Sequence, residues 1–280
     1  MKILVAEEAG FCFGVKRALK LINEYQRQGK KIQTIGPLIH NIPVLNDLAS
    51  RGVNYASSLA GIDKEKTLCI STHGLSRDSE LSLRRKGIAT LDATCPLVKK
   101  GQKIIERLGK EGSRVVLVGD KDHPEIIAAR SYAPKVRIIN SLAAARALSH
   151  SREMRVVAQT TLDTDFFKQV VAILVDKAET LHVFNTICQA TQERQEAVRR
   201  LAPKVDAVIV VGSKVSSNTR KLCQIARANN RNVMRVETCA DLRGARTLAR
   251  LKKFKSIGLS AGASTSPQEL SNVKKFLQKL

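Results

Sequence analysis

Three cysteines divide this chain of 280 residues into near-equal thirds, and no other feature restricts its fold as strongly. Cys12, Cys95 and Cys188 each stand in a polar loop between a short apolar segment and a longer helical segment. The residues 28 positions after these cysteines also lie in polar loops: His40, His123 and Ser216. Since the thirds share little residue identity, we interpret the spacing as a threefold repeat of pattern.

Short apolar runs alternate with longer helical stretches along the whole chain. The expected strands are 2–6, 33–35, 67–71, 114–118, 155–158, 207–211 and 256–259. The expected helices are 16–27, 97–111, 166–176, 192–201, 220–229, 239–248 and 267–278. This alternation is typical of parallel sheets with crossover helices. It predicts an α/β fold of three similar units, with ligands bound in the loops beyond the carboxyl ends of the strands.

The composition is typical of an ordered globular protein, and the sequence also bears on its cellular location. Hydrophobic residues make up 43% of the chain, and no apolar run approaches the ~18 residues that a membrane span needs. The N-terminus shows neither a signal-peptide core nor a transit segment, so we expect a cytoplasmic protein with no membrane partner. The formal net charge of +23 predicts attraction to anions, which include phosphorylated metabolites and acidic proteins. Because no nucleic-acid-binding motif is present, we expect no nucleic-acid partner.

The three loop cysteines suit a metal centre with three protein ligands. A structural zinc site usually has four ligands and a Cys-x₂₋₄-Cys pair, and the chain contains no Cys-x-x-Cys. An iron–sulfur cube held by three thiolates leaves one iron open to substrate, and we favour it. A catalytic zinc site on three cysteines is the alternative. Cys69, in a strand pattern, and Cys223, on an apolar helix face, are expected to be buried structural residues, and Cys239 is less clearly so.

Other polar residues in the loops after strands suggest an anion pocket. The residues concerned are His40, His73, His123, Ser216, Ser217, Asn218 and Ser264. The serine segments run from a strand through a loop into a helix start, where amide N–H groups and the helix dipole favour phosphate. Histidines, hydroxyls and amides together predict a site for a diphosphate. A nucleotide is disfavoured because neither a P-loop nor a Gly-x-Gly-x-x-Gly motif follows a strand.

Glu125 stands out among these anion-binding residues because a carboxylate repels a diphosphate. It lies two residues after His123. One explanation is a proton donor close to the reacting carbon–oxygen bond. Another is an ordinary acidic residue in the first turn of a helix. Gln159 and Thr160 are placed to orient either Glu125 or the substrate.

The order of these motifs resembles that of a known family, the 4-hydroxy-3-methylbut-2-enyl diphosphate reductases or LytB proteins of the non-mevalonate isoprenoid pathway. The resemblance runs from the first strand to the last helix. Its motifs are Gly-Phe-Cys-Phe-Gly-Val at 10–15, His-Asn at 40–41, Thr-His-Gly at 72–74, Asp-Ala-Thr-Cys-Pro-Leu-Val at 92–98, His-Pro-Glu at 123–125, Gln-Thr-Thr-Leu at 159–162, Ile-Cys at 187–188 through Arg-Gln-Glu at 194–196, Gly-Ser-Lys at 212–214 through Ser-Asn at 217–218, and Ala-Gly-Ala-Ser at 261–264.

The resemblance implies a [4Fe–4S] cluster on Cys12, Cys95 and Cys188. It implies a trefoil of three pseudo-symmetric α/β units around that cluster, each with a small, mainly parallel sheet. The expected units are 14–96, 97–190, and 191–280 joined by 1–13.

The resemblance also implies roles for the other residues. The histidines, serines and Asn218 would hold the diphosphate of a small allylic substrate, with Gln159 beside them. Glu125 would deliver protons, and Thr160 would lie close to the substrate hydroxyl. The reaction adds two electrons and two protons, releases water, and yields isopentenyl and dimethylallyl diphosphates. A ferredoxin or flavodoxin would donate the electrons. The resemblance does not account for the net charge of +23, and we expect this charge to favour docking of such an acidic donor.

Two other functions stay open on the residues alone. One is a metal-dependent hydrolase of a phosphorylated substrate, which would use zinc on the same cysteines. The other is a basic nucleic-acid-binding protein that uses an iron–sulfur centre as a sensor.

Overall fold

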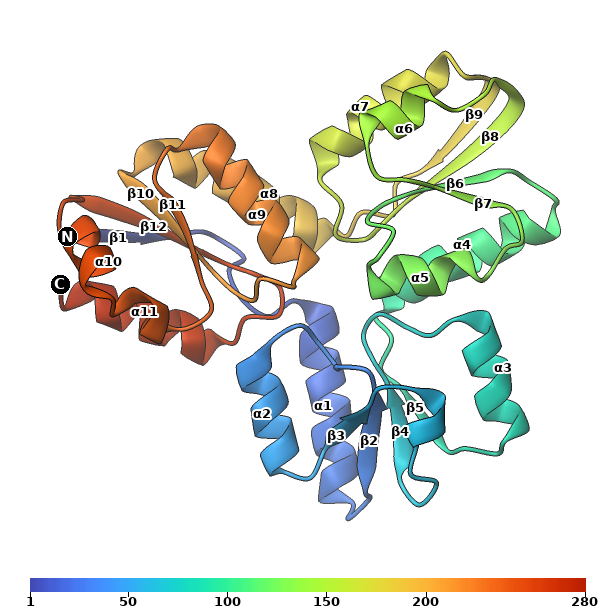
Figure 1. Cartoon of the computed structure of the whole chain (residues 1–280), viewed down its shortest axis with the longest axis horizontal. Coiled ribbons are helices and arrows are strands. Elements are labelled where there is room, and N and C mark those ends of the chain that lie inside the picture. Colours follow the sequence, from blue (N-terminus) through green and yellow to red (C-terminus); the bar gives the residue numbers. More distant parts are fainter. The chain divides into compact units, whose positions relative to one another are not determined.

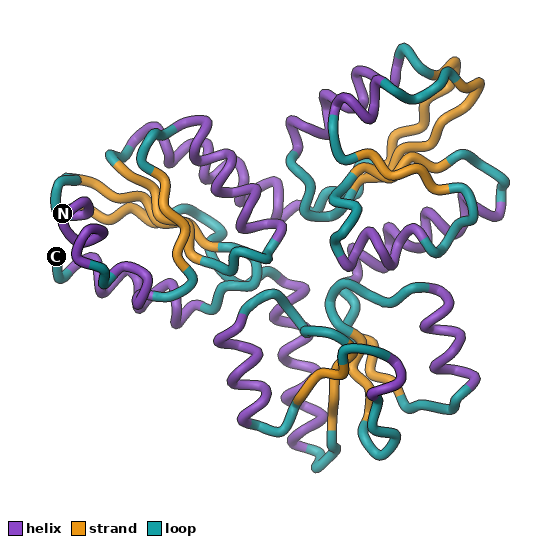
Figure 2. The backbone as a smooth tube through the Cα atoms, viewed as in Figure 1, coloured by secondary structure: helices purple, strands orange, loops and turns teal.

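The structure is a computed structural model that describes all 280 residues and divides into two compact units. The first unit comprises Met1–Lys16, Ile39–Asp47 and Gln189–Leu280. The second comprises Arg17–Leu38 and Leu48–Cys188. The strands form three separate four-stranded sheets, one in the first unit and two in the second (Figure 2).

The first unit contains one parallel sheet between two pairs of helices. Its strands lie in the order β1-β12-β10-β11 and run in parallel. Their bounds are β1 Lys2–Val5, β10 Ala207–Val211, β11 Val233–Val236 and β12 Ser256–Ala261. One face is covered by α8 (Gln189–Leu201) and α9 (Ser217–Asn229), and the other by α10 (Ala245–Leu251) and α11 (Pro267–Gln278) (Figure 1).

The second unit contains two further parallel sheets. The strands of one are β2 Ile32–Ile35, β3 Asn54–Ala56, β4 Thr67–Ile70 and β5 Thr90–Asp92, in the order β3-β2-β4-β5. The strands of the other are β6 Val115–Val118, β7 Val136–Ile139, β8 Ser151–Ala158 and β9 Ala178–Phe184, in the order β7-β6-β8-β9. The helices that lie wholly in this unit are α3 Arg77–Arg85, α4 Pro96–Lys110, α5 Pro124–Arg130, α6 Leu142–Arg146 and α7 Thr164–Val175. The helix α1 Phe13–Arg27 belongs mostly to it, and α2 Ile42–Ser50 is divided between the two units.

All three sheets have the same topology. If β1 is counted as the fourth strand after β10, β11 and β12, each sheet has the strand order 2-1-3-4. The glycine after the first strand makes the same backbone hydrogen bond each time. Its amide donates to the residue that ends the second strand, as in Gly36 to Ala56 (2.9 Å), Gly119 to Ile139 (2.9 Å) and Gly212 to Val236 (2.8 Å). The expected α/β class with three small parallel sheets is therefore confirmed.

Aliphatic side chains on the inner strands build the cores. Every residue of Val115–Val118 and Ala207–Val211 is buried, because helices cover both faces of these strands. In the β6–β9 sheet, α6 and α7 pack on one core that includes Met154 and Phe167, and α4 and α5 pack on a second that includes Leu117. The C-terminal ends of the strands are thereby held in fixed register.

One expected helix is wrong. The segment 239–248 is not continuous, since a 3₁₀ turn over Cys239–Leu242 is followed by α10 from Ala245. Thr238 and Asp241 form a capping box that starts the turn, and Gly244, in an extended conformation, is the N-cap of α10. The other six expected helices overlap observed ones, and 267–278 matches α11 at both ends.

Two further points concern the chain as a whole. The bounds of three separate domains stay a prediction, since the compact units number two and divide the chain differently. No helix has both the length and the apolar character needed to cross a membrane.

Candidate functional site

The expected site residues lie where this topology places ligands. In a sheet of order 2-1-3-4, the connections after strands 1 and 3 leave in opposite directions, and the crevice between them is the usual binding position. In the three sheets, strand 1 precedes His40, His123 and Ser216, and strand 3 precedes His73, Thr160 and Ser264. The fourth strands lead to the cysteines: Cys95, Cys188 and Cys12.

The three cysteine loops have the same backbone anchor. Each cysteine amide donates to a carbonyl in the loop after the third strand: Cys12 to Ala263 (3.0 Å), Cys95 to Thr72 (3.0 Å) and Cys188 to Thr160 (2.9 Å). Each cysteine also directly precedes a helix, namely α1, α4 or α8. The repeat seen in the sequence is therefore a repeat of loop geometry, and it holds each thiol beside a strand-3 loop of its own sheet.

These thiols differ from the structural cysteines in their surroundings. None of the six cysteines forms a disulfide, and Cys12, Cys95 and Cys188 are each partly exposed. Cys69 and Cys223 are buried, as expected, and burial raises the pKa of both thiols, that of Cys69 to about 12. Each of these thiols is accessible and stands at a helix start, where amide N–H groups favour negative charge, so its chemistry fits a ligand of an iron–sulfur cluster.

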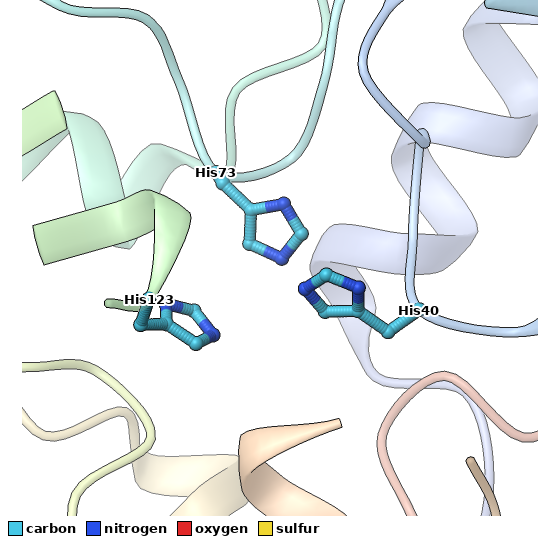
Figure 3. Close-up of side chains that lie close together, drawn as sticks. All are labelled: His40, His73 and His123. Carbon is cyan, nitrogen blue, oxygen red and sulfur yellow. The ribbon is translucent and has the colours of Figure 1, made fainter. Parts of the chain in front are cut away.

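Within the second unit, two of the expected histidines lie against each other. The ring centroids of His73 and His123 are 5.3 Å apart in an edge-to-face arrangement (Figure 3), and the figure also labels His40, which belongs to the first unit. His123 is the N-cap of α5, and its Nδ1 accepts a hydrogen bond from the Glu125 amide (3.2 Å). A neutral ring bonded in this way carries its proton on Nε2, where it is a donor suited to an anion.

Glu125 is buried in the second unit and paired with Thr160. One carboxylate oxygen accepts from the Thr160 amide (2.7 Å) and the other from its hydroxyl (2.7 Å). Burial nevertheless raises the pKa of Glu125 to about 7, since the loss of water outweighs the two hydrogen bonds. The position of Glu125 in the first turn of α5 is the one expected of an ordinary helix acid, but its raised pKa suits a group that exchanges protons near neutral pH.

Gln159 connects the two loops that carry these residues. Its Oε1 accepts from the Asp120 amide (2.9 Å), and its Nε2 donates to the Thr161 hydroxyl (2.9 Å). It is almost fully buried. These bonds make it a residue that positions the loops around Thr160, and its expected contact with substrate stays a prediction.

The first unit holds the remaining expected residues around the start of α9. Ser216 is the N-cap, accepting from the Thr219 amide (3.4 Å), and Ser217 and Asn218 are buried in the first turn. Both polar atoms of the Asn218 side chain are buried without a hydrogen-bond partner. A buried unpaired amide is costly, so this position favours a polar ligand.

His40 and Ser264 are tied together in the same unit. The Ser264 hydroxyl donates to the His40 carbonyl (3.1 Å), and the Asn41 side chain donates to the Ser264 carbonyl (2.8 Å). The pKa of His40 is lowered, first by burial and then by the nearby positive charge of Arg220. A neutral His40 can still donate one hydrogen bond to an anion, and Arg220 adds positive charge beside it.

Two arginines that anchor the cysteine loops were not among the expected residues. Arg17 donates to the carbonyls of Thr94 (3.2 Å) and Asp92 (3.4 Å) on the Cys95 loop. Arg194, almost fully buried in α8, donates to the carbonyls of Ala190 (3.0 Å) and Gly10 (3.0 Å), the latter two residues before Cys12. Arg194 stands in one of the matched motifs, which was the only sequence signal for its role.

Gly74 gives a test of how tightly the His73 loop is packed. Its φ is +78°, and a Cβ added there would lie 2.5 Å from Nε2 of the buried Gln102. Gly87, with φ +62°, has nothing within 4 Å of such a Cβ. We expect Gly87→Ala to cost about 1 kcal/mol of unfolding free energy from backbone strain alone. Gly74→Ala should cost about 1–3 kcal/mol more, because it adds overpacking.

Urea unfolding of the two variants beside the unaltered protein measures this difference. Equal midpoints for Gly74→Ala and Gly87→Ala would show that the loop is loosely packed.

Comparison with known proteins gives a consistent result. The family model for LytB protein matches residues 3–278. The chain is 40% identical to the 4-hydroxy-3-methylbut-2-enyl diphosphate reductase of Aquifex aeolicus, over 99% of this chain and 96% of the relative. It is 39% identical to the protein of the same name from Helicobacter pylori, over 98% of each chain.

Solved structures agree with these relatives. The structure described as (E)-4-hydroxy-3-methyl-but-2-enyl diphosphate reductase, the terminal enzyme of the non-mevalonate pathway, matches with a TM-score of 0.70 and 38% identity, covering 100% of both chains. The corresponding reductase from Plasmodium falciparum matches with a TM-score of 0.92 and 30% identity, covering 100% of this chain and 87% of the other.

Proposed function

Since this chain belongs to the LytB family, whose members are 4-hydroxy-3-methylbut-2-enyl diphosphate reductases, we propose that its cysteine loops and buried carboxyl group carry out that reduction. The chain is an oxidoreductase of the last step of the non-mevalonate pathway and acts on a small diphosphate. In the overall reaction, the substrate takes up two electrons and two protons, its carbon–oxygen bond breaks, and the hydroxyl leaves as water. The products are isopentenyl and dimethylallyl diphosphates.

The observation that carries the proposal is the position of Thr160. Its carbonyl accepts from the Cys188 amide, and its hydroxyl donates to Glu125. One residue thus joins a cysteine loop to a buried carboxyl group with a pKa near neutrality. A redox centre and a proton donor held by the same residue suit a reaction that adds both electrons and protons.

We propose that Cys12, Cys95 and Cys188 hold a [4Fe–4S] cluster. The shared loop geometry and the accessible thiols support this assignment. When bound, the cluster supplies single electrons and one iron that can act as a Lewis acid. Arg17 and Arg194 fix the carbonyls of the Cys95 and Cys12 loops, and so pre-organise the thiols.

The diphosphate is the part of the substrate that the protein binds most extensively. We assign it to His40, His73, His123, Ser216, Ser217, Asn218 and Ser264. The unpaired Asn218 amide and the start of α9 support this, since both offer N–H donors to an anion. Binding energy from the unreactive diphosphate fixes the orientation of the alcohol.

Glu125 and Thr160 then transfer a proton to the substrate. Glu125 in its protonated form can donate through the Thr160 hydroxyl, which both accepts and donates hydrogen bonds. Because both side chains are buried, water does not compete for the proton, which stays available for the leaving hydroxyl. We place the reaction in the cytoplasm, where a reducing environment keeps thiols available. An acidic redox protein, such as a ferredoxin or flavodoxin, is the proposed electron donor.

Anaerobic purification and assay test this function against its two alternatives. A brown protein with iron and sulfide, which reduces the allylic diphosphate with dithionite and a viologen dye, is the expected result. A colourless protein with stoichiometric zinc would favour a hydrolase of a phosphorylated substrate. A brown protein that binds nucleic acid but does not reduce the diphosphate would favour the sensor.

A further inference from the structure

We propose that the exposed basic face of α4 beside Cys95 is the docking surface for the acidic electron-donor protein. The inference rests on the proposed function, since it concerns how electrons reach the cysteine-bound centre. The basic α4 face is defined by four side chains of α4, namely Lys99, Lys100, Lys103 and Arg107, together with Arg17 of α1. All belong to the second unit.

This face surrounds a surface cavity of about 620 Å³. The five basic residues line it together with a single carboxylate, Asp92. Such an excess of one sign of charge focuses the field and attracts partners of opposite charge. The chain as a whole has a net charge of +23, and this cavity is a place where that charge is concentrated beside a functional loop.

Two lysines of the face have no counter-charge of their own. Lys99 is paired with Glu80 (2.8 Å) and Asp92 (3.5 Å), and Arg107 lies near Glu111 (3.8 Å). Lys100 and Lys103, both exposed, form no ion pair. They lie three residues apart on one side of the helix, so an incoming carboxylate could reach both.

The cavity reaches the metal-binding loop itself. Thr94 and Pro96, which flank Cys95, are among its lining residues. Arg17 donates to the Thr94 carbonyl and so links the charged face to the loop. A donor seated there would contact both sequence neighbours of Cys95.

Apolar side chains within the basic face favour a protein partner over a small polyanion. Leu97 is 39% exposed directly after Pro96, and Ile104 lines the cavity between the charged residues. Protein interfaces combine apolar and charged side chains. Charge complementarity of this kind sets the association rate and the choice of partner.

A charge-reversal pair with a matched control tests the proposal. Lys100→Glu with Lys103→Glu alters the face, and Lys64→Glu with Lys135→Glu makes the same change in net charge. Lys64 and Lys135 are exposed and precede β4 and β7, at the ends of the two sheets opposite to the cysteine loops. Arg17 is left unchanged because it supports the Cys95 loop.

The probe is a purified acidic flavodoxin, used both as a binding partner in calorimetry and as the electron donor in turnover. We expect the Lys100/Lys103 variant to raise the Kd and the KM for flavodoxin at least tenfold at low salt. The control pair should change either value less than threefold. Turnover driven by dithionite and a viologen dye should stay within twofold of the unaltered protein in both variants, which confirms that the reductase itself is intact.

Three results would overturn the docking surface. The first is equal affinity of the two variants for flavodoxin. The second is a loss of dye-driven turnover in the Lys100/Lys103 variant as large as its loss of turnover with flavodoxin. The third is binding of flavodoxin to the unaltered protein that does not change with ionic strength. Failure of the proposed function gives a different result, since the unaltered protein would then not reduce the diphosphate even with dye as the electron source. Calorimetry would still measure the Kd for flavodoxin in that case.

Discussion

Replacement of Cys12, Cys95 or Cys188 by serine should remove nearly all of the iron and sulfide that the anaerobically reconstituted protein retains. Each thiol is held in an equivalent loop, so loss of any one would leave two of the three proposed ligands. A serine hydroxyl is a harder ligand than thiolate and suits iron–sulfur clusters poorly. Iron and acid-labile sulfide per chain, with the visible absorbance of the cluster, measure the effect.

Cys69→Ser is the matched control. Cys69 is fully buried in β4, and burial raises the pKa of its thiol to about 12, so we expect this variant to keep the cluster. Near-equal iron and sulfide in all four variants would contradict the assignment of ligands.

Glu125→Gln should lower kcat by about a hundredfold or more, since general acid catalysis contributes ~10²–10⁴ in rate. Glutamine retains the size of the side chain and can accept from the Thr160 amide, but its carboxamide has no acidic proton to transfer. Cluster content and KM should therefore change little. Steady-state kinetics with dithionite and a viologen dye measure both parameters.

The matched control and the pH profile make this prediction specific. Asp122→Asn removes a carboxylate from an exposed position of the loop that leads into α5 and should leave kcat unchanged. Because the pKa of Glu125 is raised to about 7, its protonated fraction falls as pH rises through that value, and kcat of the unaltered protein should fall with it. A Glu125→Gln variant that keeps normal kcat, or that shows the same decline at alkaline pH, would exclude Glu125 as the proton donor.

Apart from the edge strand β1, the strands that were predictable from sequence are the inner strands of the three sheets. The seven expected strands correspond to β1 and to all six inner strands of the three sheets. The five that were missed, β3, β5, β7, β9 and β11, are all edge strands. An inner strand such as Val115–Val118 is a continuous apolar run, whereas β9 has exposed residues at Glu179 and Thr180 and carries no such signal.

The missed helices are short and are defined by tertiary packing. The structure contains α2, α3, α5 and α6, and the longest of these has 9 residues. Isolated helices of that length are only marginally stable, and their few residues give too weak an apolar periodicity to predict them from sequence. The start of α5 nevertheless matters to the site, because it is there that His123 accepts from the Glu125 amide.

The site residues were easier to find than the contacts between them. Loops after parallel strands are the natural positions for ligands, and this identified His123, Thr160 and Ser216 by chain order alone. The bonds that join Thr160 to Cys188 and Glu125 depend on strand register and helix packing. The role of Arg17 was hidden for the same reason, since its partners lie more than seventy residues away in the sequence.

Mössbauer spectra of the anaerobic, isotopically labelled protein, recorded with and without 4-hydroxy-3-methylbut-2-enyl diphosphate, test the central claim most directly. Three thiolate ligands predict a cube in which one iron site differs from the other three, and substrate should alter the spectrum of that site alone. Four equivalent iron sites that do not respond to substrate, or a protein that takes up zinc in place of iron, would contradict the account.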